Sequence, residues 1–216
     1  MMVRARGKVL RCHCPTTGRL GDLELRGLPC LYSTSESVKR KTRYTVEAFS
    51  ASTGRGKSWI GINQTAANKY VEFFLKHSLL PKIAKGEVKR EVRLGRSRID
   101  FLVGNTLVEV KTPLITLPAS PSARRARHGR FDSFDRLIRH MGELAAALEM
   151  GKEAVILMCY LYDAKPFIPP VRDGTNSRIL DAAEEAERKG VLRWQVNLGI
   201  DRTGVRLIRY FPSTRY

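Results

Sequence analysis

The chain has 216 residues, of which 39 are lysine or arginine and 21 are aspartate or glutamate, so its formal net charge is +18. Hydrophobic residues make up 43% of the chain, which is enough for a core and excludes a disordered basic tail. The length suits one domain or two small ones. A positive charge of this size speeds association with polyanions, so nucleic acid is the leading class of partner.

Membrane insertion and secretion are not indicated. No apolar run reaches the roughly 18 residues of a membrane-spanning helix, and no apolar stretch follows the charged residues 1–14 as in a secretory signal. Four cysteines are too few for a disulfide framework. Cys12-His13-Cys14 lacks the spacer with which paired cysteines wrap a tetrahedral zinc, so we expect ordinary strand cysteines there. We therefore expect a soluble cytoplasmic protein with no membrane partner; a homo-oligomer is compatible with the sequence.

The first part of the chain predicts a small β-barrel. Short strands separated by turn residues are expected at 8–14, 22–25, 28–33 and 43–50. Residues 52–58 contain two glycines and no apolar residue, which is typical of a linker. We therefore expect one domain at 1–58 and a second at 59–216.

The second part alternates helices and strands, which predicts an α/β domain. Thr65 would cap a helix that Pro81 closes, and residues 87–94 alternate apolar and charged side chains as a half-buried strand does. Two strands flank Gly104-Asn105. The remaining elements are expected as a helix at 132–150, a buried strand at 154–162, a helix at 177–189, and strands at 192–198 and 205–211.

The hairpin around Gly104-Asn105 carries the candidate chemistry. A two-residue turn there places Asp100 opposite Glu109. The other face of the hairpin is then apolar and consists of Ile99, Phe101, Val103, Val108 and Val110. Residues directly opposite each other have Cβ atoms about 4.5–5.5 Å apart, and like charges there repel by roughly 3 kcal/mol at an effective dielectric constant near 20. A divalent cation between them would remove this cost, and all-oxygen ligands favour Mg²⁺ or Mn²⁺.

Lys111 lies on the same face as Glu109, two residues further along the strand. It could hold an attacking water or neutralise charge on a phosphate. The alternative is an exposed hairpin in which Glu109 and Lys111 form a solvated ion pair.

These residues resemble a known family. Asp100, a hairpin and Glu109-Val110-Lys111 resemble the core of the PD-(D/E)xK nuclease superfamily, and Ser97-Arg98-Ile99-Asp100-Phe101 resembles its sugar fermentation stimulation protein A (SfsA) branch. The likeness extends to His13-Cys14-Pro15-Thr16-Thr17-Gly18, Tyr32-Ser33-Thr34-Ser35, Lys39-Arg40-Lys41, and the set Arg136, His140, Glu143 and Leu144. It implies an OB-like β-barrel followed by a PD-(D/E)xK restriction-endonuclease-like α/β domain, with Asp100, Glu109 and Lys111 as the catalytic core.

The resemblance also points to a third carboxylate. Glu91, in Arg90-Glu91-Val92, matches the family's pattern and would join Asp100 and Glu109 as a catalytic residue and metal ligand. Glu87, on the same face of the same strand, is the alternative carboxylate. A plain ion pair of Glu91 with Lys89 or Arg93 is equally compatible with the sequence.

Basic residues predict where a nucleic acid would bind. One cluster consists of Lys39, Arg40, Lys41 and Arg43, and a second consists of Arg124, Arg125, Arg127 and Arg130. Such side chains contact phosphates without distinguishing bases, so binding should depend little on sequence. Arg136 and His140 would lie opposite the apolar stripe of their helix and touch phosphate, or else belong to a plain polar face. Tyr32, Tyr44 and Phe49 could stack on bases, but aromatics at strand spacing more often pack in a core.

Two functions remain from the sequence. The first is a Mg²⁺- or Mn²⁺-dependent nuclease that hydrolyses the backbone of nucleic acid, most simply DNA, with little sequence specificity. The second is a non-catalytic DNA-binding or regulatory protein on a nuclease fold. A sugar-metabolising enzyme finds no support, because the sequence has no phosphate-cradling glycine loop.

Overall fold

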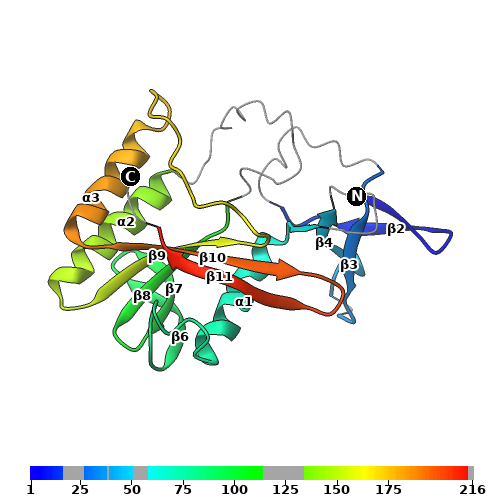
Figure 1. Cartoon of the computed structure of the whole chain (residues 1–216), viewed down its shortest axis with the longest axis horizontal. Coiled ribbons are helices and arrows are strands. Elements are labelled where there is room, and N and C mark those ends of the chain that lie inside the picture. The colour runs from blue at the N-terminus through cyan, green and yellow to red at the C-terminus, as the bar shows by residue number, and fades with distance from the viewer. Residues whose placement is uncertain (17–26, 38, 51–57, 114–133, 214–216) are drawn as a thin grey trace.

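The structure, a computed structural model, describes residues 1–16, 27–37, 39–50, 58–113 and 134–213. Within these residues the chain forms a five-stranded N-terminal sheet, followed by a six-stranded sheet with three helices (Figure 1). No helix in this part of the chain is long and apolar enough to cross a membrane.

The N-terminal sheet has the strand order β1-β2-β4-β3, with β5 paired to β4. Its strands are β1 (Met2–Ala5), β2 (Lys8–His13), β3 (Cys30–Thr34), β4 (Tyr44–Ser50) and β5 (Trp59–Gly61). Its core contains Val3, Cys12, Val46, Phe49 and Ile62. The strand expected at 22–25 lies outside the described residues. β5 pairs with β4 through Phe49 and Ile60, so it joins the first sheet although it follows the boundary predicted at residue 58.

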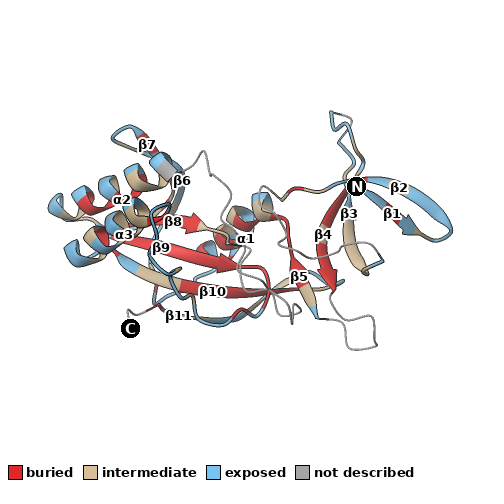
Figure 2. Ribbon diagram, turned by 90° about the horizontal axis from the view of Figure 1, so that it is seen from above, coloured by how far each residue is buried: buried red, intermediate tan, exposed pale blue. Residues whose placement is uncertain are grey.

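The second sheet has the order β11-β10-β9-β8-β7-β6. Its strands are β6 (Val88–Leu94), β7 (Ser97–Val103), β8 (Thr106–Lys111), β9 (Glu153–Tyr160), β10 (Leu192–Ile200) and β11 (Val205–Pro212). β8, β9 and β10 are parallel neighbours, and the other neighbouring pairs are antiparallel. The central strands β8 and β9 are almost wholly buried, as expected for strands covered on both faces (Figure 2).

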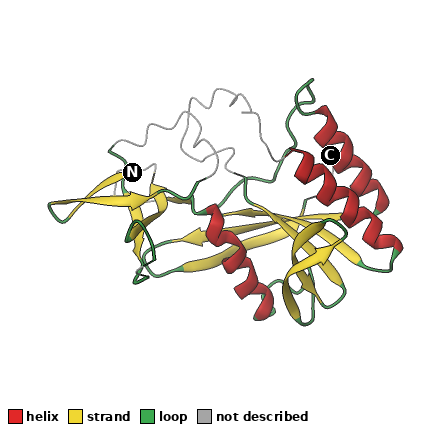
Figure 3. Cartoon of the chain, turned by 180° about the vertical axis from the view of Figure 1, so that it is seen from behind, coloured by secondary structure: helices red, strands yellow, loops and turns green. Residues whose placement is uncertain are grey.

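Helices cover both faces of this sheet. The helix α1 (Gln64–Lys76) packs on one face, and α2 (Phe134–Glu149) and α3 (Ser177–Lys189) pack side by side on the other (Figure 3). The predicted helices are therefore confirmed. Thr65 does not cap α1, however: the Asn63 side chain accepts a hydrogen bond from the Ala66 N–H at 3.2 Å, and the Thr65 hydroxyl donates to Asn63.

Each face of the sheet has its own hydrophobic core. The α1 side contains Phe101, Val103, Val108 and Val110, as the hairpin register predicts. Ile99 does not join them. It packs on the other side with Met141 and Leu144 of α2, so the expectation that it shares a face with Phe101 is wrong.

The reason is a local reversal of side-chain alternation at Glu91. Glu91 lies across from Asp100, because Arg90 pairs with Phe101 and Val92 pairs with Ile99. Its φ of 53° is left-handed, a conformation that costs a non-glycine residue about 1–2 kcal/mol. The apolar side chains of β6 and β7 therefore point to opposite faces of the sheet before and after this position, and Asp100 lies where the switch occurs.

The two sheets are joined at a close contact. The Gly61 N–H donates to the Leu161 carbonyl at 2.8 Å, directly after β9. Asn63 donates to the Glu47 carboxylate of β4 at 2.7 Å while it caps α1. These contacts hold the N-terminal sheet against the start of α1 and the carboxyl end of β9.

Candidate active site

Glu109, on β8, is the centre of the site. Its side chain is only 3% exposed and lies on the α2 side of the sheet. Its Oε1 accepts hydrogen bonds from Lys111 Nζ at 2.7 Å and from His140 Nδ1 at 2.6 Å. Its Oε2 is buried and has no hydrogen-bond partner within the described part of the chain. A buried carboxylate oxygen without a partner is costly, so this atom marks a place for a ligand.

Asp100 is held at the edge of the same site. Its Oδ1 accepts from Asn68 Nδ2 of α1 at 2.7 Å, and its Oδ2 accepts from the Val110 N–H at 2.8 Å. Burial, followed by the charge of Glu109, raises the pKa of Asp100 above its ordinary value, although these hydrogen bonds and Lys111 act in the opposite direction. The rise indicates that the ionised form of Asp100 is opposed first by its burial and then by the negative charge of Glu109.

The hairpin register predicted around Gly104-Asn105 is confirmed by the pairs Phe101–Val108, Leu102–Leu107 and Val103–Thr106. The ion pair between Lys111 and Glu109 also exists, but it is not the solvated pair of the alternative hypothesis. Glu109 is buried, whereas the Lys111 side chain is 29% exposed. Lys111 therefore connects a buried carboxylate to solvent.

Glu91 and Glu87 differ in their positions relative to Asp100. Glu91 lies across from Asp100, but its exposed carboxylate is 3.6 Å from Arg98, not paired with Lys89 or Arg93 as the ion-pair alternative expects. Glu87 binds Lys89 at 3.3 Å near the start of β6. The register therefore favours Glu91 over Glu87 as the carboxylate nearest the site.

His140 and Arg136 lie differently from what the sequence predicted. His140 is 2% exposed, so the prediction that it faces away from the apolar stripe of α2 is wrong. Positions 137, 140, 141 and 144 share one helical face because they are three and four residues apart. Arg136 is exposed, and its Nε lies 3.4 Å from His140 Nε2. Glu143 instead accepts from the Arg96 N–H at 2.9 Å and ties α2 to the β6–β7 turn.

Asn68 is a site residue that sequence reasoning did not assign. Its signals were a loose match to the start of the corresponding helix in the resembling family and its place one turn into α1, and neither reveals that α1 crosses the sheet beside Asp100. Gln64, one turn earlier, donates to the Thr112 carbonyl just after Lys111. The first two turns of α1 therefore hold both ends of the site.

The basic clusters are only partly described. Lys39, Lys41 and Arg43 are exposed before β4, and Arg40 donates to the Thr45 hydroxyl at 2.9 Å. The second cluster, Arg124, Arg125, Arg127 and Arg130, lies outside the described residues. Among the aromatics, Phe49 is buried in the core, while Tyr32 and Tyr44 are partly buried and contact each other edge to face.

The donor set fits a hard divalent cation. Asp100 and Glu109 supply carboxylate oxygens. One of these oxygens, Oε2 of Glu109, has no hydrogen-bond partner among the described residues. The described residues contain no cluster of three or more His, Cys, Asp or Glu side chains with ligand geometry. A cation here would therefore keep several waters, as Mg²⁺ does, and a zinc cage is not formed. The four cysteines are all free, as expected.

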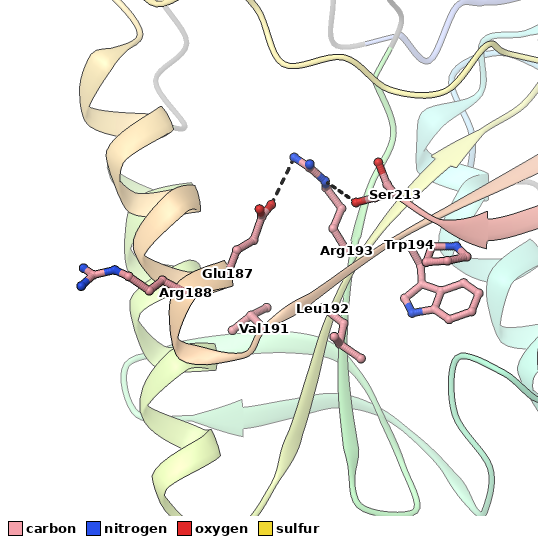
Figure 4. A pocket seen from close by; sticks show the side chains of 8 residues that line it. Glu187, Arg188, Val191, Leu192, Arg193, Trp194 and Ser213 are labelled. Atoms are coloured by element: carbon pink, nitrogen blue, oxygen red, sulfur yellow. Dashed lines mark hydrogen bonds and ion pairs between the residues drawn. The ribbon is translucent and has the colours of Figure 1, made fainter. Parts of the chain in front are cut away.

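A pocket elsewhere on the domain does not overlap this site. It has a volume of about 340 Å³ and lies between the end of α3 and the β10–β11 pair (Figure 4). Its Glu187 and Arg193 bind each other at 3.2 Å. None of the residues assigned from the sequence lines it.

The fold and the site define a class: an N-terminal OB domain followed by a restriction-endonuclease-like α/β domain with an Asp, hairpin, Glu-x-Lys arrangement. Family models agree with this division, since the SfsA N-terminal OB domain matches residues 1–62 and the sugar fermentation stimulation protein RE domain matches residues 65–204. The chain belongs to the sugar fermentation stimulation protein (SfsA) family.

Individual relatives support the assignment. A sugar fermentation stimulation protein homolog of Alcanivorax borkumensis is 32% identical over 205 residues, covering 90% of this chain and 83% of its own. The homolog of Teredinibacter turnerae is 29% identical and covers 80% of this chain and 73% of its own. The solved structure of SfsA of Pyrococcus furiosus in complex with Ca²⁺ aligns with a TM-score of 0.73 at 23% identity, over 97% of this chain and 88% of that one.

Proposed function

We propose that this protein is a Mg²⁺- or Mn²⁺-dependent phosphodiesterase that binds DNA through its backbone and cleaves it with little sequence specificity. The observation that carries the proposal is Oε2 of Glu109, which is buried beside Asp100 and has no partner among the residues that the structure describes. Lys111 compensates part of the negative charge of the two carboxylates, and a cation beside them would compensate the rest. A protein selected only for stability would not retain them.

Each residue has a distinct role in this proposal. Asp100 and Glu109 hold the cation, with Asp100 oriented by Asn68 and the Val110 N–H. Lys111 keeps its ammonium group at the solvent side of Glu109, where it can orient a water or offset charge on a phosphate oxygen. A bound divalent cation would polarise the phosphate and lower the pKa of a coordinated water. Glu91 is the proposed third carboxylate.

Binding of nucleic acid rests on charge. The net charge of +18 attracts a polyanion, and Lys39, Lys41 and Arg43 are exposed just before β4. We include Arg40, the cluster from Arg124 to Arg130, and Arg136 in the proposed binding surface. Phosphate contacts of this kind supply affinity without base recognition. The Pyrococcus furiosus relative was solved with Ca²⁺, which supports a divalent cation in this family.

The proposal is tested by incubating the protein with single- and double-stranded DNA and RNA, with Mg²⁺, Mn²⁺ or chelator. Asp100→Asn should abolish cleavage, whereas Asp181→Asn should not. Asp181 is a matched control because it is an exposed carboxylate on α3 that pairs with Arg172. Binding without cleavage under every condition would refute the enzyme and favour the non-catalytic DNA-binding protein.

A second experiment tests the DNA surface. The variant with Lys39, Lys41 and Arg43 all changed to Gln should bind duplex DNA more weakly. The slope of log affinity against log salt should fall by about 0.9 for each phosphate that the variant no longer neutralises. Arg178, Arg188 and Lys189 of α3, changed together to Gln, remove the same charge and serve as the control. An equally weakened affinity in both variants would show that only net charge matters.

A further inference from the structure

A chain of three side chains runs from solvent to the buried carboxylate. Arg136, exposed on α2, places Nε 3.4 Å from His140 Nε2, and His140 Nδ1 lies 2.6 Å from Glu109 Oε1. His140 and Glu109 are both almost fully buried. We propose that Arg136 and His140 are positioning residues that fix the orientation of Glu109, so that its Oε2 faces the cation. They do so because Arg136 acts together with Glu109 to determine which nitrogen of His140 carries the proton.

The tautomer follows from the donors and acceptors at each end. A guanidinium group only donates hydrogen bonds, so Nε2 of His140 must be the acceptor toward Arg136. The ionised carboxylate of Glu109 only accepts, so Nδ1 must carry the proton that is donated to it. Both ends of the ring therefore require the same tautomer, with the proton on Nδ1. A histidine donating to a ligand carboxylate in this way fixes the orientation of that carboxylate.

The consequence falls on Glu109. His140 and Lys111 approach the same oxygen, Oε1, from α2 and from β8. With two donors at the Oε1 position and no partner for Oε2 within the described residues, any tilt of the carboxylate away from this orientation breaks hydrogen bonds and forms none, whereas a half turn only exchanges two equivalent oxygens. The two oxygen positions are therefore distinguished by the protein. Arg136 and His140 thus have a role toward Glu109 that the sequence did not suggest.

This inference deepens the proposed function and rests on it only where cation binding is measured. The tautomer can be read without any cation, from long-range ¹H–¹⁵N correlations of the imidazole rings, with His140 assigned by the signal missing in His140→Asn. We expect the His140 proton on Nδ1 in the wild type. In Arg136→Met, which keeps an apolar stem but removes the donors, the Nε2–H form should become populated. A proton on Nε2 in the wild type, or no change in Arg136→Met, would overturn the proposal.

Calorimetric titration with Mn²⁺ provides the second measurement. His140→Leu should weaken Mn²⁺ binding by about 10- to 100-fold, as removal of such supporting contacts does. His140→Asn should retain much of the affinity, because its side-chain amide can donate from near the position of Nδ1. If His140 only filled space, His140→Leu and His140→Asn would bind Mn²⁺ equally. Arg139→Met is the control, since Arg139 lies on the same helix and contacts the Ser97 hydroxyl.

The outcomes separate the two proposals. If the wild type binds Mn²⁺ and His140→Leu binds it as tightly as the wild type and the Arg139→Met control do, the positioning role is refuted and the proposed function stands. If the wild type binds no divalent cation, the proposed function fails, and the tautomer measurement still decides whether Arg136 controls the proton of His140.

Discussion

Replacing Asp100 by Asn should have opposite effects on stability with and without a divalent cation. In chelator at neutral pH the wild type contains two neighbouring carboxylates, and the raised pKa of Asp100 shows that ionisation of this side chain opposes folding. The amide that replaces the carboxylate carries no charge. It can accept from the Val110 N–H, and the Asn68 amide can turn to present its oxygen, so both hydrogen bonds of Asp100 survive in neutral form.

The magnitude follows from two opposing terms. Removal of the charge relieves its burial, which is the largest cause of the raised pKa, and then the repulsion from Glu109; two like charges about 5 Å apart repel by roughly 3 kcal/mol at an effective dielectric constant near 20, which we take as the size of the gain. Exchange of two charge-assisted hydrogen bonds for neutral ones costs about 1 kcal/mol each. Asp100→Asn should therefore be more stable than the wild type by about 1 kcal/mol in chelator, which raises the thermal midpoint by about 2–4 °C in a protein of this size.

Thermal unfolding in chelator and in saturating Mg²⁺ or Mn²⁺ tests this reasoning. Cation at 100 times its dissociation constant stabilises the wild type by about 2.7 kcal/mol but not the variant, so the order of stability should reverse. The advantage of the variant in chelator should also vanish as the pH falls through the folded-state pKa of Asp100 toward the ordinary value of 3.8, because the wild-type side chain then becomes neutral. An Asp100→Asn protein less stable than the wild type in chelator, at every pH, would refute the argument.

Three further outcomes are expected. Lys111→Met should lower cleavage by about 100-fold or more with DNA binding retained in a gel-shift assay, and an equal decrease of both would contradict a role in chemistry. Gly61→Ala should lower the free energy of unfolding in urea by about 1–3 kcal/mol, because the new Cβ would lie 2.8 Å from the Leu161 carbonyl oxygen. Gly142→Ala in α2 is the control: its Cβ meets no atom within 4 Å, so the free energy of unfolding should rise by up to about 1 kcal/mol. Burial raises the pKa of Cys159 to about 12, so its thiol should resist alkylation at pH 8 until the protein unfolds; rapid labelling of native protein would contradict this.

The parts of the site that lie within one hairpin could be predicted from the sequence. Gly104-Asn105 determines the register, and the register determines which residues face each other. The carboxylates Asp100 and Glu109 and the adjacent Lys111 were therefore identified from spacing and residue type alone. The two-layer covering of the sheet also followed, because β9 is apolar on both faces.

The parts that depend on tertiary packing could not be predicted. The left-handed residue Glu91 reverses the alternation of β6 and β7, and no glycine or proline marks that position. His140 faces the sheet because packing of α2 against the sheet determines the rotation of the helix about its axis. The spacing of polar residues in the sequence suggested the opposite face. Asn68 comes from a helix some thirty positions earlier in the chain than Asp100, and only the crossing of α1 over the sheet brings the two together.

The hydrogen bond from the Val110 N–H to Asp100 has a consequence for how sequences of this kind are interpreted. The hydrogen-bonded pairs between β7 and β8 extend only from Phe101–Val108 to Val103–Thr106, and beyond them the Asp100 side chain takes the place of a strand partner for β8. An acceptor at this position is thus needed to hold the hairpin closed, whether or not the protein cleaves anything. A descendant that no longer hydrolysed its substrate would still be under pressure to keep a side chain of this shape. The presence of Asp100 alone is therefore weak evidence for catalysis, and Oε2 of Glu109, which has no partner among the described residues, is stronger evidence.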